Sequence, residues 1–102
     1  MLGAYNTKGR LINCVITQCG YSGILSGSNA LIELEGDQTK VDGNVTSGDS
    51  DYYGLDTHDT SSIIHLLFPL TKESVSTNNH NGQNYNSRSG VIVTVESFDT
   101  LA

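Results

Sequence analysis

The sequence predicts an all-β fold in which the chain winds once per repeat of about 30 residues. Apolar residues recur at every second position, which is the period of a strand that buries one of its faces. Gly, Asn, Ser and Asp interrupt these runs after every few residues, as turns require, and helix signals are almost absent. The length of 102 residues allows one domain, so residues 1–102 are treated as a single unit.

Short alternating runs, separated by polar turns, are the predicted strands. Each repeat holds a longer alternating run, a short run opened by Tyr-x-Gly or Tyr-Gly, and an aliphatic run. The predicted strands cover residues 10–17, 23–27, 30–36, 39–46, 52–57, 61–67, 73–78 and 90–98.

The runs recur in the same order, and this recurrence predicts how they stack. The aligned residues are Gly23 and Ile24 with Gly54 and Leu55 at 31 residues, Ile32 and Leu34 with Ile64 and Leu66 at 32, and Ile12, Cys14 and Ile16 with Val41, Gly43 and Val45 at 29. A third copy starts at Val75 and Thr77 and ends in GVIVTVE. Hairpins of a small β-sandwich, the alternative fold, have no reason to recur in this way. A coil that winds once per repeat does, because each strand stacks on its counterpart one turn later.

This stacking model assigns a core and a set of corners. The residues expected to point inward are Ile12, Cys14, Ile16, Ile24, Ile32 and Leu34 in the first coil and Val41, Val45, Leu55, Ile64 and Leu66 in the second. Asn13, Asn44, Asn78 and Asn79 suit corners, where left-handed backbone and side-chain hydrogen bonds are needed. Cys14 and Cys19 are expected to be packed thiols, with a disulfide or redox pair as the alternative.

The charge balance excludes two classes of partner. The net charge is −6, with only five Lys and Arg residues, whereas nucleic acids and anionic membrane surfaces require a basic face. No stretch approaches 18 apolar residues, and no basic region followed by an apolar run opens the chain. We therefore expect no nucleic acid, no membrane insertion and no signal peptide.

Three phrases resemble successive coils of right-handed parallel β-helix proteins of the pectate-lyase-like superfamily. They are INCVITQCGYSGI, TKVDGNVTSGDSDYYGLDTHDTSSI and ESVSTNNHNGQNY, and the resemblance covers residues 10–96. That superfamily includes polysaccharide lyases, epimerases, and tailspikes and appendage proteins of bacteriophages. The resemblance implies a right-handed parallel β-helix of about three coils, roughly 15 Å tall. Such a short stack has unpaired ends, so we expect either a fragment of a longer spike or self-association.

The resemblance to phage spikes also implies a homotrimer on a virion or in the extracellular space. Residues 90–102 are the expected capping or trimerisation strand.

The segment from Tyr53 to Asp59, YGLDTHD, resembles the Tyr-Gly-x-Asp-Pro-His-Glu/Asp motif of mannuronan C-5 epimerases. The resemblance implies that Tyr53 and His58 are the catalytic acid and base and that Asp56 orients the substrate or faces its carboxylate. Two features depart from the motif. Thr57 replaces the proline, and residues 80–84 carry no aspartate where the family places a further catalytic one.

Other residues are candidates for substrate binding on the flanks of the coil. Tyr21, Tyr52, Tyr53 and Tyr85 are expected to form a ladder along one edge, suited to sugar faces or trimer contacts, with edge packing as the alternative. The predicted substrate-binding residues are Tyr21, Tyr52, Tyr85, Lys40, Lys72, Asp59 and His80, with Arg88 as a further cationic candidate beside the two lysines.

No metal or cofactor is expected. Asp49, Asp51, Asp56 and Asp59 follow no calcium-loop spacing, and nothing brings His58, His65 and His80 together. Asp51, Asp56 and Asp59 offer possible carboxylate pairs for glycoside hydrolysis, at a separation that the sequence leaves open.

The function predicted is a structural and adhesive segment of a viral or phage spike or appendage that binds host-surface polysaccharide. The alternative is a carbohydrate-active enzyme, a uronan C5-epimerase, lyase or glycoside hydrolase, with its site on one flank. A third possibility is a β-sandwich module without catalysis. Whether the chain is an enzyme stays open at this point.

Overall fold

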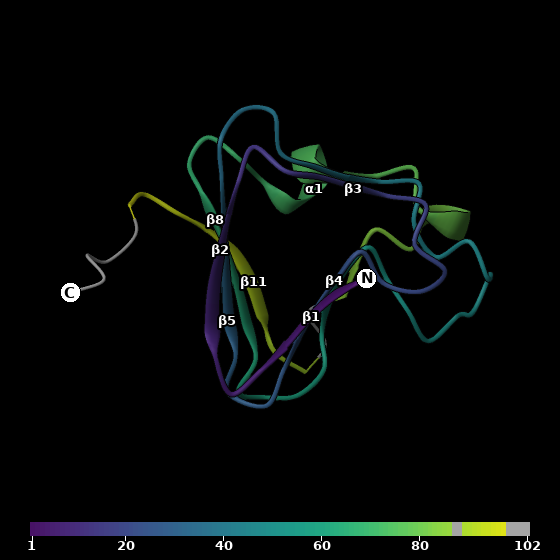
Figure 1. Ribbon diagram of the computed structural model, residues 1–102, viewed down its shortest axis with the longest axis horizontal. Coiled ribbons are helices and arrows are strands. Elements are labelled where there is room, and N and C mark those ends of the chain that lie inside the picture. Colours follow the sequence, from purple (N-terminus) through teal and green to yellow (C-terminus); the bar gives the residue numbers. More distant parts are fainter. Residues whose placement is uncertain (87–88, 98–102) are drawn as a thin grey trace.

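The computed structural model describes residues 1–86 and 89–97, and within them the fold is almost entirely β-strand (Figure 1). Arg88 and residues 98–102 of the expected capping or trimerisation strand lie outside the described residues. The strands are β1 (Leu2–Tyr5), β2 (Lys8–Ile12), β3 (Val15–Thr17), β4 (Ile24–Gly27), β5 (Leu31–Glu35), β6 (Lys40–Asp42), β7 (Leu55–Thr57), β8 (Ile63–Leu67), β9 (Ser76–Thr77), β10 (Tyr85–Asn86) and β11 (Val91–Val95). One short α-helix, α1 (Lys72–Val75), and a 3₁₀ turn (His80–Gly82) interrupt them.

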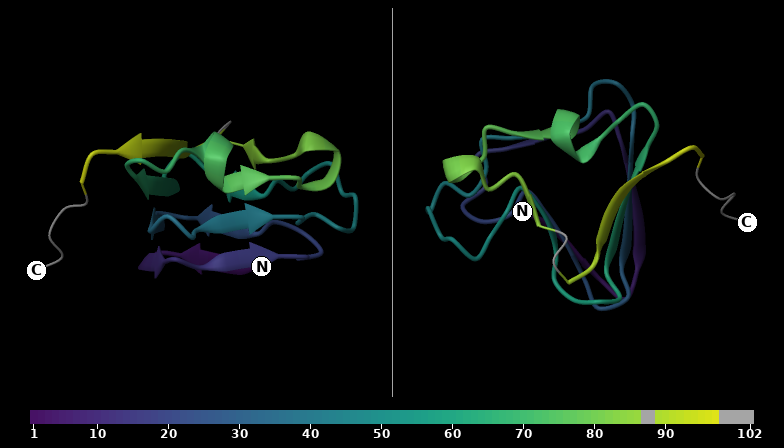
Figure 2. Two further views of the ribbon diagram at one scale, coloured as in Figure 1. Left: turned by 90° about the horizontal axis from the view of Figure 1, so that it is seen from above. Right: turned by 180° about the vertical axis from the view of Figure 1, so that it is seen from behind.

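The described strands form three sheets, and every pair within them is parallel. Sheet A has the order β1-β4-β7-β10, sheet B has β2-β5-β8-β11, and sheet C has β3-β6-β9. The chain visits A, B and C in turn, so each strand pairs with its counterpart one turn later. Figure 1 shows the sheets as three sides of a triangle, and Figure 2 shows the turns stacked in layers. The all-β prediction is confirmed, and the β-sandwich alternative is wrong because sandwiches pair their strands antiparallel.

The register predicted from the Gly-aliphatic repeat is confirmed in sheets A and B. Ile24 pairs with Leu55, and Ile32 and Leu34 pair with Ile64 and Leu66. The inward side chains of the middle turns are fully buried, because alternate residues of each strand face the interior. The buried apolar core comprises Ile24, Ile32, Leu34, Val41, Leu55, Ile64, Leu66, Leu70, Val75 and Ile92.

The predicted register of the first turn is wrong. The segment 10–17 is not one strand, because Asn13 adopts a left-handed φ of 51° and turns the chain from sheet B into sheet C. Ile16 therefore pairs with Val41, at an offset of 25 residues, rather than with Val45 at the predicted 29. Ile12 pairs with Glu35 on the outer face and is 56% exposed, so it does not belong to the core. Cys14 lies at this corner, and both cysteines are free and half-buried.

Two further elements differ from the prediction. The first turn begins with β1, upstream of residue 10, where the sequence showed no clear alternation. The predicted strand 73–78 begins instead as α1, because Thr71 and Ser74 form a capping box in which each side chain accepts the other's backbone N–H at 3.0 Å. No helix in the described residues is long and apolar enough to cross a membrane.

The corner between sheets C and A is held by an asparagine ladder, formed by Asn44 and Asn79. Asn44 Oδ1 accepts the Cys19 N–H at 3.0 Å, and its Nδ2 donates to the Ile16 carbonyl at 3.1 Å. Asn79 repeats both contacts one turn later, accepting from Asn44 N at 2.9 Å and donating to the Val41 carbonyl at 3.4 Å. Both asparagines are buried, so their side chains replace backbone hydrogen bonds that water cannot supply.

The ladder explains the repeated glycines of YSGI and YYGL. A methyl group on Gly23 would lie 2.6 Å from Val41 Cγ1 and 2.9 Å from Asn44 Nδ2. A methyl group on Gly54 would lie 2.5 Å from Asn79 Nδ2 and would also overlap Ser76 Oγ. Glycine is therefore required at both positions because side chains of the asparagine ladder approach the backbone closely, and not because the backbone is left-handed.

Candidate functional site

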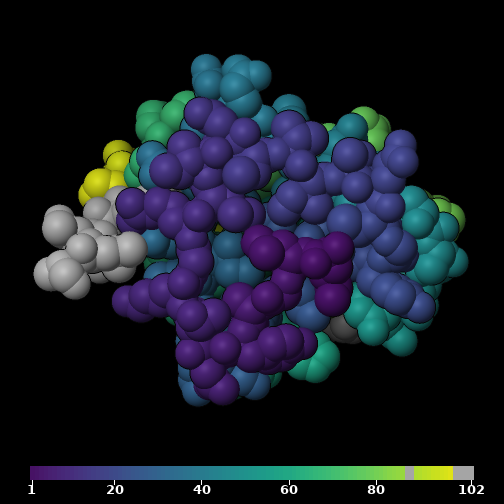
Figure 3. All heavy atoms as spheres, viewed as in Figure 1, coloured from purple at the N-terminus to yellow at the C-terminus, as the bar shows by residue number. Residues whose placement is uncertain are grey.

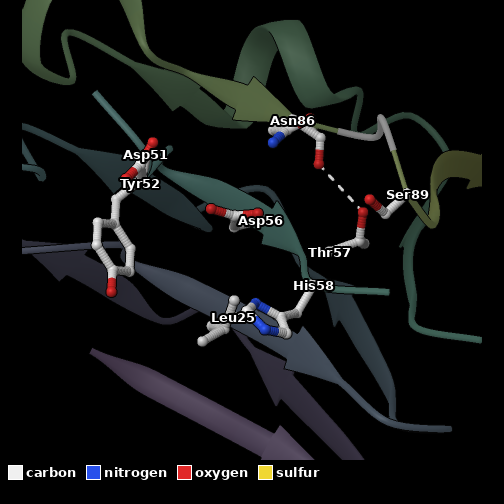
Figure 4. Close-up of a pocket in the computed structure, with 8 residues that line it drawn as sticks. All are labelled: Leu25, Asp51, Tyr52, Asp56, Thr57, His58, Asn86 and Ser89. Atoms are coloured by element: carbon white, nitrogen blue, oxygen red, sulfur yellow. Dashed lines mark hydrogen bonds between the residues drawn. The ribbon is translucent and has the colours of Figure 1, made fainter. Parts of the chain in front are cut away.

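A pocket of about 360 Å³ lies on the outer face of sheet A (Figure 4). Leu25 of β4, Asp56 of β7 and Asn86 of β10 form one outward column across three turns, because Leu25 pairs with Asp56 and Asp56 pairs with Asn86. The rest of the lining comes from the loop before β7, from the last residue of β7, and from residues beyond β7 and β10, namely Asp51, Tyr52, Thr57, His58 and Ser89. The site is therefore assembled from segments of different turns.

Asp56 forms the floor of this pocket and is only 5% exposed. Its Oδ2 accepts hydrogen bonds from Ser22 Oγ and from the backbone N–H of Tyr53, each at 3.3 Å. In the view of Figure 4, Asp56 lies between Tyr52 on one side and His58 and Ser89 on the other. These bonds hold the carboxylate in a fixed orientation beneath the opening.

Tyr52 forms the aromatic wall of the pocket. Its ring packs against Tyr21 of the previous turn, with ring centroids 4.8 Å apart and planes tilted by 47°. Gln83 of the next turn fixes the loop, because its Nε2 donates to the carbonyl oxygens of Tyr52 at 2.6 Å and Asp49 at 2.9 Å. The ring is thus supported from both neighbouring turns.

The structure brings together two of the three predicted catalytic residues. Asp56 and His58 line the same pocket, and His58 is exposed. Tyr53 is absent from the described lining; it is half-buried and contributes its backbone N–H to Asp56. The tyrosine of the described lining is Tyr52, one residue earlier. The acid/base pair of Tyr53 and His58 stays a prediction.

The predicted substrate-binding residues are dispersed. Of that set, Tyr52 lines the pocket and Tyr21 packs behind it. Tyr85 is not on the tyrosine edge: it pairs with Leu55 in the inward column, and its hydroxyl donates to Glu73 of α1 at 3.4 Å. The tyrosine ladder is thus reduced to the Tyr21–Tyr52 pair and the adjacent Tyr53.

The predicted cationic groups lie away from the described pocket lining. Lys40 Nζ donates to the Ser74 carbonyl at 2.8 Å, and Lys72 Nζ lies 5.2 Å from the Tyr85 ring centroid. His80 is exposed on the 3₁₀ turn. In the described residues, no group of three or more His, Cys, Asp or Glu side chains is placed to hold a metal ion.

Asp59 has a structural role at the corner between sheets A and B. Its Oδ2 accepts from Ser28 N at 2.9 Å in the turn below and from Ser28 Oγ at 3.3 Å. Its Oδ1 accepts from Ser61 N and Ser61 Oγ, at 3.1 and 2.9 Å, and from Ser62 Oγ at 3.2 Å. A carboxylate offers about four lone-pair sites, so these bonds leave little capacity for a ligand.

The hydrogen bond from the Ser61 side chain, aided by the other donors of this corner, lowers the pKa of Asp59 below its ordinary value of 3.8. A carboxyl group with a lowered pKa in the folded state stabilises the fold above pH 3.8, and this stabilisation is lost as the pH falls through the folded-state pKa. We expect Asp59→Asn to lower the melting temperature at neutral pH and to reduce its further fall in acid. Thermal melts from neutral pH to about pH 2 measure both effects.

The matched control is Asp37→Asn, whose exposed carboxylate accepts one bond at 3.4 Å from the neighbouring Gln38. We expect Asp37→Asn to leave the pH profile unchanged. An Asp59→Asn variant with the wild-type profile would contradict the structural role of this carboxylate.

The sequence did not indicate four members of the site. Leu25, Asn86 and Ser89 line the pocket, and Ser22 donates to Asp56 from beneath it. The position of Asn86 follows from the register of sheet A. Because Tyr85 pairs with Leu55, the next residue, Asn86, pairs with Asp56 and lies beside it in the outward column. Ser22 and Ser89 carry no local signal, since each belongs to a polar turn.

Comparison with protein-family models, curated proteins and solved structures gives no match for this chain.

Proposed function

We propose that the chain is a right-handed parallel β-helix segment with a structural and adhesive role in a viral or phage spike or appendage. In this proposal, the pocket on sheet A binds a polysaccharide of the host surface. The β-helical winding is supported by the order of the strands, because the chain passes through the three parallel sheets in turn. Right-handedness is supported by the general rule that about 98% of crossovers between parallel strands of one sheet are right-handed.

The observation that carries the binding role is the composition of the pocket. The Tyr52 ring is held against Tyr21, with ring centroids 4.8 Å apart, and is therefore pre-organised to contact the apolar face of a sugar. Asp56, His58, Asn86 and Ser89 line the same pocket beside the ring with hydrogen-bonding groups suited to sugar hydroxyls. An apolar platform beside convergent polar groups is the usual form of a small-molecule site.

We expect Tyr52→Ala to weaken glycan binding about tenfold, because a stacked ring contributes about 0.5–1.5 kcal/mol beyond the area that it buries. Binding is measured by screening an array of bacterial surface polysaccharides and titrating the best ligand by calorimetry. Tyr5→Ala is the matched control, since Tyr5 is 52% exposed at the far end of sheet A. An array without any ligand for the wild-type chain would contradict the adhesive role.

His58→Ala is expected to weaken the same binding about three- to tenfold, the cost of one hydrogen bond of roughly 0.5–1.5 kcal/mol. The fold should persist, because His58 is exposed. Circular dichroism checks the fold and calorimetry the affinity. Unfolding of His58→Ala would show that the residue is structural.

The enzymatic alternative rests on one observation, that Asp56 and His58 line one pocket. A buried, oriented carboxylate and an exposed imidazole are groups that proton transfer at a sugar ring uses. Incubation with alginate tests it through the absorbance of unsaturated sugar and exchange of the C5 proton. Turnover that disappears in His58→Ala would favour the enzyme; absence of turnover would leave binding alone.

A further inference from the structure

The charge of the pocket on sheet A limits which sugars can bind in it. Two carboxylates line the pocket, the exposed Asp51 on the loop before β7 and the buried Asp56 on the floor. In Figure 4, Asp51 and Tyr52 lie on the same side of Asp56. No lysine or arginine is part of the described lining. With histidine counted as neutral, this lining is anionic.

The five cations of the sequence do not reverse this balance. Lys8 and Arg10 belong to β2 in sheet B, on a different side of the triangle. Lys40 and Lys72 contact residues of the third turn, away from the described lining. Arg88 lies outside the described residues, and as a single guanidinium it balances at most one of the two carboxylates. The pocket therefore keeps an excess of negative charge whether or not Arg88 is counted with it.

The loop that carries Asp51 is braced beside the aromatic wall of the pocket. The Asp51 N–H donates to Asp49 Oδ1 at 2.9 Å, and Gln83 Nε2 donates to the carbonyl oxygens of Asp49 and Tyr52 on either side. Figure 3 shows this loop at the surface, in teal, next to the loop of the preceding turn, in blue. Among the described residues, no hydrogen bond or ion pair engages the Asp51 carboxylate. It is therefore accessible to a ligand that reaches the ring.

A carboxylate beside an aromatic ring is suited to an organic ammonium group. The ammonium donates charge-assisted hydrogen bonds to the carboxylate, and a tyrosine ring attracts a cation that lies within about 6 Å of its centroid. A sugar with a free amino group supplies this cation together with hydroxyl groups and an apolar face. A uronate supplies an anion instead, which the two carboxylates repel. The same charges therefore disfavour the uronans that the enzymatic alternative would use.

We propose that the pocket binds amino sugars, sugar units with a free and protonated amino group, within the polysaccharide of the proposed function, on which this inference rests. Asp51 accepts from the ammonium group at the rim, beside the Tyr52 ring. Asp56 adds a second negative charge on the floor. A sugar amine is largely protonated at neutral pH, as an α-amino group is. The net charge of −6 also attracts a cationic polymer to the chain.

The test is calorimetry with oligosaccharides that differ only in the amino group. Oligomers of glucosamine and of galactosamine are titrated at neutral pH in free-amine and N-acetylated forms, beside an oligogalacturonate and the sugar-free amine spermidine. We expect a free-amine oligomer to bind about tenfold more tightly than its acetylated form, the combined effect of a cation–π contact and an exposed ion pair. Added salt should reduce this preference, because it screens the charges. The oligogalacturonate and spermidine should bind more weakly than the free-amine oligomer.

Asp51→Asn removes the exposed carboxylate at nearly constant size. We expect this variant to lose most of the preference for the free amine and to keep the wild-type affinity for the acetylated oligomer, which also shows that the pocket is intact. Asp37→Asn is the matched control, because it removes the same charge from an exposed aspartate that is not part of the described lining. We expect Asp37→Asn to keep the full preference.

Several outcomes would overturn this inference and leave the adhesive role intact. They are equal affinity for the free-amine and acetylated forms, tighter binding of the oligogalacturonate, spermidine binding as tight as that of the amino oligomers, and array ligands that all lack a free amine. A preference lost equally in Asp37→Asn would also overturn it, because the cause would then be net charge and not Asp51. If no polysaccharide of the array binds, the adhesive role itself fails.

Discussion

Asn79→Ala is expected to lower the free energy of unfolding by about 3 kcal/mol, among the larger effects that one substitution produces. The side chain is 3% exposed and bonds to the buried Asn44 N–H and the Val41 carbonyl of the turn below. Alanine would leave the buried Asn44 N–H without its partner, which costs about 1–3 kcal/mol, and would also remove the bonds from the Asn79 amide to Ser76 Oγ and Asn84 Oδ1. Urea denaturation at fixed protein concentration measures the change.

Asn81→Gly is the control for this substitution. Asn81 is exposed two residues along, and its φ of 53° suits glycine, so the side chain is removed without adding backbone strain. We expect a change within about 0.5 kcal/mol. If Asn79→Ala were equally mild, the asparagine ladder would not hold the corner.

Gly54→Ala is expected to lower the free energy of unfolding by about 2 kcal/mol, the usual cost of overpacking a core. The added methyl group would meet Ser76 Oγ and the amide of Asn79, whose Cγ lies 2.8 Å from its position. Neither can retreat easily, because Asn79 Nδ2 donates to Ser76 Oγ at 3.0 Å and both residues are buried. The measurement is again urea denaturation.

Gly9→Ala is the matched control, since a methyl group there would have no atom within 4 Å. We expect it to be neutral or slightly stabilising, because alanine restricts the unfolded chain. The double variant Gly54→Ala/Asn79→Ala should be less destabilised than the sum of the single effects, because removing the amide relieves the overlap. If the effects of the two substitutions were additive, the overlap of the new methyl group with the Asn79 amide would not be the cause of the destabilisation.

Sheets A and B could be predicted from the sequence because their signal is local. Alternation buries one face of each strand, and the Gly-Ile and Gly-Leu pairs mark the same position in successive turns, as the pairing of Ile24 with Leu55 confirms. The first turn could not be aligned in this way. Its inward residues Leu11 and Ile16 are only partly buried, and the corner at Asn13 shortens the offset to 25 residues.

The candidate site was predictable only in part. The segment from Asp56 to Asp59 carries more polar groups than a turn requires, which is why the sequence marked it, and the structure places Asp56 and His58 at one pocket. Asp59 was marked by the same signal, and the structure places its carboxylate among serine donors of the corner. Side-chain direction at a corner depends on which donors the adjacent turns supply, and sequence spacing does not contain that information.

By itself, the sequence determined the all-β class, the winding in turns and the buried columns of the middle turns, because these follow from the period of two and from the repeat. Only the tertiary structure decided which side chains meet across turns. It placed Tyr52 on Tyr21, Asn86 above Asp56 and Tyr85 over the core. The physical reason is that burial along a strand is local, whereas contacts between turns depend on the length and backbone conformation of every corner between them.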